Sequence, residues 1–198
     1  MQMNSANDAL RRIVTFVAAL NAAYFGIEFA IASAIGSVAL FADSIDFLED
    51  ASVNFLILAA LGWTARNRAR VGMLLAGILL APGLATLWTA WRKLTAPTPP
   101  EPLLLVLAGL GALAINLSCA AMLARYRRHS GSLTRAAFLS ARNDAFANVA
   151  IIAAGLVTAF AWPSAWPDLI VGLAIAAMNA NAARAVWVAA RDEHRAIA

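Results

Sequence analysis

The 198 residues are 62% hydrophobic and only 13% charged, and their mean hydropathy is +0.73. Soluble globular domains are about 45–50% apolar and about 25% charged, and disordered chains contain even fewer apolar residues. The composition therefore excludes an ordinary soluble domain and a disordered chain, which leaves an integral membrane protein. The net charge of +4 would also suit a nucleic-acid-binding protein, but the positions of the basic residues do not support that interpretation.

Six apolar stretches follow one another along the chain, and a helix of roughly 20 residues crosses a bilayer. They cover residues 12–34, 38–62, 71–94, 103–124, 133–161 and 168–190. Short segments that contain glycine, arginine or proline separate them, and the four prolines within 97–102 cannot continue a helix. The stretches are too long and too closely joined for a soluble bundle, in which each helix shows a polar face. We therefore predict an all-α integral membrane bundle of six transmembrane helices, a single domain over residues 1–198 with no soluble domain.

The basic residues predict the orientation of the bundle. Twelve of the 15 fall on one side of the predicted spans, namely Arg11, Arg12, Arg66, Arg68, Arg70, Arg125, Arg127, Arg128, Arg135, Arg184, Arg191 and Arg195. Only Arg92 and Lys93 fall on the other side, while Arg142 lies within the fifth stretch. The positive-inside rule then places both termini in the cytoplasm, and we expect a multi-pass protein of the bacterial inner membrane. The first stretch also resembles a signal peptide, but it is span-length and contains Asn21 and Glu28.

Several acidic residues lie within the predicted membrane spans. Six of the 11 acids fall within the predicted spans, namely Glu28, Asp43, Asp46, Glu49, Asp50 and Asp144. An ionised carboxylate at the bilayer centre costs about 2.5–3.5 kcal/mol on insertion scales. Arg142 is the one base at that depth, so most of these acids need a bound cation, protons or a water-filled cavity.

The spacing of these acids places them on two helix faces. In the second and fifth helices, residues spaced by three or four form polar stripes, namely Asp43, Asp46 and Asp50, and Ser140, Asp144 and Asn148. Two such stripes facing each other would gather carboxylate oxygens around a small volume, which favours a divalent metal ion. Their titrations would be coupled, so that metal exchanges with protons. The alternative is that these polar groups only bond helices together across the bundle.

The remaining intramembrane acids have a less specific interpretation. Glu28 and Glu49 are each expected either to pair with Arg142 or to line a proton path beside Asp43. On helical spacing Arg142 points roughly opposite to the stripe of the fifth helix. We therefore assign four residues to a proton path or to the groups that support the metal ligands, namely Asp43, Glu49, Glu28 and Arg142.

Three segments resemble motifs of the cation diffusion facilitator family. Residues Leu40–Asp50, LFADSIDFLED, resemble its second-helix motif, in which an Ala-Asp-Ser-like start leads to His or Asp, three residues and Asp. Residues Ser140–Asn148, SARNDAFAN, resemble its fifth-helix motif, in which a ligand precedes Asp by four. The segment from Asp168 to Asn179 is similar to the opening of its sixth helix. The resemblance spans essentially the whole chain, and it implies six helices, cytoplasmic termini and efflux of Zn²⁺ or a similar ion against protons, usually by a homodimer.

Carried over residue by residue, the resemblance implies a transport site made of Asp46, Asp50 and Asp144. The position that is His in many zinc transporters is Ser140 here, and an all-oxygen site favours harder ions such as Mn²⁺ or Fe²⁺. The candidates that would complete the shell are Ser140, Asn143 and Asn148. Family members often carry a cytoplasmic metal-binding domain after the sixth helix, and the few residues that follow it here lead us to expect that this domain is missing.

The sequence therefore predicts a secondary transporter that exports a divalent cation in exchange for protons. The expected substrate is Zn, Mn, Fe, Co or Cd, with no permanently bound cofactor, and the expected partners are the bilayer, protons and a second copy, without nucleic acid. One alternative is a non-transporting membrane metal sensor or assembly subunit. Another is an exporter of small organic cations, for which only Phe41, Phe47 and Phe146 supply aromatic groups near the acids. No nucleophile–histidine arrangement or Gly-rich phosphate loop indicates an enzyme.

Overall fold

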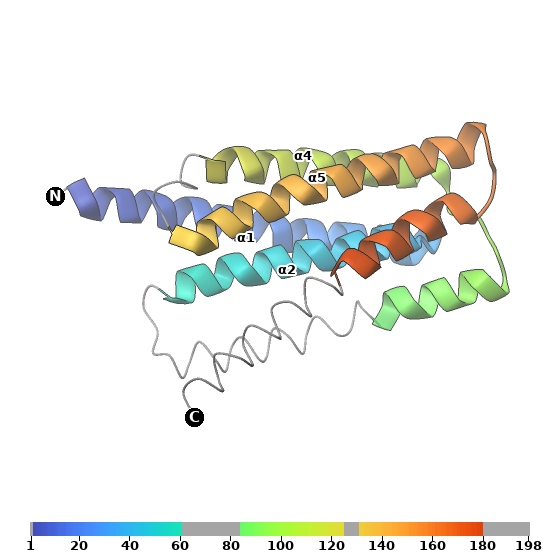
Figure 1. Ribbon diagram of the computed structural model, residues 1–198, viewed down its shortest axis with the longest axis horizontal. Coiled ribbons are helices and arrows are strands. Elements are labelled where there is room, and N and C mark those ends of the chain that lie inside the picture. Colours follow the sequence, from blue (N-terminus) through green and yellow to red (C-terminus); the bar gives the residue numbers. More distant parts are fainter. Residues whose placement is uncertain (1, 61–83, 125–130, 180–198) are drawn as a thin grey trace, which may run out of the picture.

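The computed structural model describes residues 2–60, 84–124 and 131–179, and these form six helical segments (Figure 1). The segments are α1 (Gln2–Ile35), α2 (Val38–Ala60), a helix over 84–95, α4 (Pro102–Ala124), α5 (Gly131–Phe160) and the helix Trp166–Asn179. The predicted all-α fold with six helices is confirmed. The first part of the predicted third stretch and the end of the sixth lie outside the described residues.

The helices form two antiparallel pairs that pack side by side. α1 lies along α2 and α4 lies along α5, and the pairs meet through α1 with α4 and α2 with α5. The connections 36–37, 96–101 and 161–165 all lie at one end of the bundle, while the N-terminus lies at the other (Figure 1). We call the end that carries these three connections the connection end.

Local chemistry explains where α1 ends and where α2 and α4 begin. Gly36 has a φ of 62°, the left-handed conformation that terminates a helix at low cost only for glycine. Ser37 then caps α2, because its Oγ accepts a hydrogen bond of 3.1 Å from the amide of Leu40. At α4, Pro102 occupies the first helical position, and the Glu101 carboxylate accepts bonds from the first amides of the helix.

The polarity of the bundle is the reverse of that of a soluble protein. Large apolar side chains cover the outside, as shown by Phe146 at 71% exposure and Phe160 at 85%, whereas acids and amides lie inside. Among the described residues, three helices are long and apolar enough to cross a membrane, namely Asp8–Ile35, Pro102–Ala124 and Ser140–Phe160. Four exposed tryptophans of the described residues lie in the helix over 84–95 or in and just after the connection 161–165, as expected for an interfacial belt, namely Trp88, Trp91, Trp162 and Trp166.

The helix Trp166–Asn179 packs very closely on the start of α2. A Cβ atom at Gly172 would lie 2.6 Å from the backbone nitrogen of Ala39. Only glycine permits this approach, which brings the first turn of the sixth helix next to the first turn of α2.

Candidate functional site

The predicted polar stripe of α2 faces the interior of the bundle. Asp43, Asp46 and Asp50 are exposed by 0%, 8% and 5%, and Asn54 continues the stripe at 1%. Glu49, to one side of the stripe, is half-buried. The i, i+3, i+7 spacing keeps the three aspartates on one helix face, so burial of that face buries all of them.

Residues of α5 meet this stripe, and Ser140 lies between two of the acids. Its hydroxyl donates to Oδ2 of Asp144 over 3.5 Å within α5, and it also bonds Asp50 on α2. Asp144 interacts electrostatically with both Asp46 and Asp50. The structure thus brings together the three predicted ligand carboxylates and Ser140. Within the described residues, no three Asp, Glu, His or Cys side chains already enclose a space that would hold a metal ion, so binding requires these side chains to move closer together.

Asn148, the other polar residue of the α5 stripe, is occupied by protein contacts. Its Nδ2 donates to Oδ2 of Asp43 over 2.6 Å, and its Oδ1 accepts from Nδ2 of Asn116 over 3.0 Å. These two hydrogen bonds link α2, α5 and α4 through buried side chains. Spacing alone did not reveal the roles of Asp43 and Asn116 in it, because their contacts depend on how the helices are rotated against each other.

Two of the three residues between Ser140 and Asp144 are exposed. Arg142 and Asn143 are exposed, and Nη2 of Arg142 donates to Oδ1 of Asn143 over 3.2 Å. In the described ranges Arg142 forms no ion pair, with Glu28, Glu49 or any other acid. Of the four residues assigned to a proton path, Glu28 and Asp43 are fully buried together, Glu49 lies at the edge of the α2 stripe, and Arg142 lies outside this cluster.

The sequence reasoning missed a polar hub at the connection end. Asp168, at the start of the sixth apolar stretch, is completely buried and forms an ion pair of 2.6 Å with Lys93. Asp168 also accepts from Ser37 Oγ over 2.6 Å and from the amides of Val38 and Ala39 over 2.9 and 3.1 Å. One signal was available, since Lys93 is the only lysine in an apolar chain and a charge there requires a partner.

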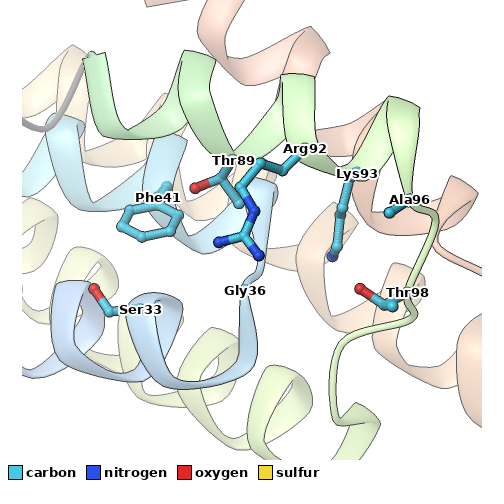
Figure 2. Close-up of a pocket in the computed structure, with 8 residues that line it drawn as sticks. All are labelled: Ser33, Gly36, Phe41, Thr89, Arg92, Lys93, Ala96 and Thr98. Carbon is cyan, nitrogen blue, oxygen red and sulfur yellow. The ribbon is translucent and has the colours of Figure 1, made fainter.

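A basic cavity of about 350 Å³ lies beside this hub (Figure 2). Figure 2 shows the Arg92 guanidinium extending toward the turn at Gly36, with Lys93 and the hydroxyl of Thr98 nearby. Two basic side chains make this cavity a poor site for a cation. The acids on α2 and α5 therefore remain the chemically suitable place for a positively charged substrate.

Residues 14–192 match the sequence profile of the cation efflux transmembrane domain. The chain belongs to the cation efflux family. This confirms the resemblance drawn from the second, fifth and sixth helices. A cation efflux protein is an integral, multi-pass membrane transporter of metal cations and not an enzyme. No curated protein matches the sequence.

Proposed function

We propose that this cation efflux protein exports a divalent transition-metal ion in exchange for protons, and that Asp46, Asp50 and Asp144 bind the ion. The observation that carries the proposal is that Asp46, Asp50 and Asp144 are buried and interact electrostatically across α2 and α5, with Ser140 bonded to Asp50 and Asp144, inside a bundle whose exterior is apolar. Within the described ranges none of the three has a basic partner. A divalent cation supplies the missing charge, and protons replace it when the ion leaves.

The exchange follows from the charge of the site in its two states. An ion that enters from the cytoplasm meets ionised carboxylates and displaces their remaining protons. A rocking movement of the helices then exposes the site to the outside, where a lower pH protonates the carboxylates and releases the ion. A proton gradient directed inward therefore drives efflux of the metal.

Ser140 is our choice to complete the ligand shell. Asn143 is exposed, and both polar atoms of the Asn148 amide already have protein partners. The resulting shell contains only oxygen atoms, which favours Mn²⁺ or Fe²⁺ relative to a shell that contains imidazole.

The proposal is tested by metal-driven proton flux in proteoliposomes that contain a trapped pH indicator. Asp50→Asn and Asp144→Asn remove one ligand charge each while keeping the side-chain shape, so we expect flux to fall to the level of protein-free liposomes with both Zn²⁺ and Mn²⁺. Glu101→Gln makes the same chemical change in an exposed position at the start of α4, and it should leave the flux unchanged.

Unchanged flux in both aspartate variants would contradict the assignment of the ligands. Metal binding by the wild-type protein without any flux would favour the alternative of a non-transporting metal sensor. Tight binding of Zn²⁺ with no response to Mn²⁺ would contradict the preference for harder ions.

A further inference from the structure

Glu28 is a buried acid that no described group neutralises. It lies on α1 with a side-chain exposure of 0%, and neither of its carboxylate oxygens has a hydrogen-bond donor among the described residues. The group that faces it is the carboxyl of Asp43 on α2, close enough for a proton on one to be shared with the other. Two carboxylates in this position repel each other and lack solvation, so the pair requires a positive charge between them.

The surroundings of the pair leave one proton-binding position open. Oδ2 of Asp43 accepts from Asn148, while Oδ1 of Asp43 has no partner among the described residues. The other titratable groups that act on Glu28 are Tyr24 and Asp46. Tyr24 is not a donor to the pair, because its hydroxyl donates to the carbonyl of Ala108 over 2.6 Å. The oxygens left without a partner are therefore both oxygens of Glu28 and Oδ1 of Asp43, in two carboxyls that contact each other.

A proton fits this position better than a metal ion does. Transition-metal ions such as Zn²⁺ take about four or more ligands, whereas the described side chains offer two carboxylates here. A single proton requires only the two facing oxygens, and it converts their repulsion into a short hydrogen bond.

We propose that Glu28 binds one of the exchanged protons and shares it with Asp43, at a position separate from the ligands of the metal. The inference rests on the proposed function, because it assigns the proton of that exchange. Asp46 lies three residues from Asp43 on the same face of α2 and interacts electrostatically with Glu28. A cation at Asp46 therefore favours the ionised form of Glu28, which releases its proton to solvent. Departure of the cation restores the repulsion, and Glu28 takes up a proton again.

The decisive measurement is the number of protons released when metal binds. The full chain is purified in detergent and titrated with Mn²⁺ or Zn²⁺ in a weakly buffered solution, with calorimetry giving the metal stoichiometry and a pH indicator the proton count. Glu28→Gln mimics the protonated acid and cannot release a proton. We expect unchanged metal stoichiometry and a proton release that falls by about one per chain. Glu101→Gln is the matched control, and its proton release should equal that of the wild type.

Either of two results would overturn the inference. An unchanged proton release in Glu28→Gln would show that the exchanged protons come from elsewhere. A loss of metal stoichiometry in this variant would make Glu28 a ligand instead of a separate proton site.

Infrared spectroscopy tests the proton site without any transport. The wild-type protein without metal should show a band from the C=O stretches of protonated carboxylic acids at neutral pH, and in Glu28→Gln this band should lose the contribution of Glu28. If Glu28→Gln does not fold, Asp43→Asn should shift the band, because it replaces the partner of the shared proton. A protein that shows the band but binds no metal would contradict the proposed function alone, and a band that neither variant alters would contradict this inference alone.

Discussion

The carboxylate of Asp168 binds four groups from two other parts of the chain. Beside the ion pair with Lys93, it accepts from the hydroxyl and amides at the start of α2, where the positive end of the helix dipole favours an anion. These contacts join the start of α2, the helix over 84–95 and the helix Trp166–Asn179. One residue therefore holds three helices together at the connection end.

Replacement of Asp168 by Ala should strongly destabilise the protein. It leaves the Lys93 ammonium buried at 4% exposure without a counter-charge, and breaking a buried pair in this way costs about 3–5 kcal/mol. We expect a marked drop in Tm of the detergent-solubilised protein, measured by the loss of the monodisperse peak on heating. The double variant with Lys93→Met should recover part of the loss, because it removes the buried charge. An unchanged Tm in Asp168→Ala would contradict the role of the hub.

At the scale of single residues, the sequence predicted which side chains are buried better than it predicted their hydrogen-bond partners. The acids of α2 could be identified because a period of three and four places them on one face, whatever that face contacts. The bonds from Asn148 to Asp43 and Asn116 could not, because they depend on the rotation of three helices about their axes. The partners of Asp168 could not be predicted either, because they depend on the contact of the first turn of its helix with the start of α2 and with Lys93.

At the scale of elements, glycine and proline predicted helix ends, whereas the limits of the apolar stretches did not. Gly36 ends α1 and the prolines of 97–102 separate two helices, as expected from their backbone chemistry. α1, however, begins at Gln2, ten residues before the start of the first apolar stretch. Apolar stretches report the length that lies in lipid, whereas backbone hydrogen bonding continues the helix into the polar region beyond it.

Two helical glycines provide a matched test of the packing between elements. Gly172→Ala places a methyl group against the backbone at Ala39, and overpacking of this kind costs typically about 1–3 kcal/mol. At Gly26 on α1, the position that a Cβ atom would take has no neighbouring atom within 4 Å, so Gly26→Ala should leave stability unchanged or raise it by up to about 1 kcal/mol. The thermal stability of the two variants in detergent distinguishes them. Equal Tm values would contradict the close approach of the sixth helix to α2.

At the scale of the whole molecule, the distribution of apolar and acidic side chains indicates an apolar environment around the bundle. Apolar side chains such as Phe146 and Phe160 face outward, and the acids of α2 face inward, which is stable only when the surroundings are themselves apolar. Composition predicted the apolar surroundings, and the positions and spacing of the acids predicted the polar interior. The orientation of the bundle and the homodimer stay predictions, because the positive-inside rule and the family resemblance support them without a contact in the described residues.

Cysteine labelling tests the predicted orientation. The single native cysteine, Cys119, is buried, so Cys119→Ala provides a background without an accessible thiol. In this background a cysteine introduced by Thr98→Cys, in the exposed loop at the connection end, should react with an impermeant maleimide in intact cells. A cysteine introduced by Asp8→Cys, near the other end of α1, should react only after the membrane is permeabilised. The reverse pattern would place the termini outside.

The pairing of Lys93 with Asp168 has a consequence for biogenesis. The two residues are 75 positions apart, and five helical segments precede the one that supplies the carboxylate. During synthesis Lys93 therefore lacks this partner until the helix Trp166–Asn179 is inserted. A nascent chain that stops before this helix leaves Lys93 without the carboxylate with which it pairs in the folded protein.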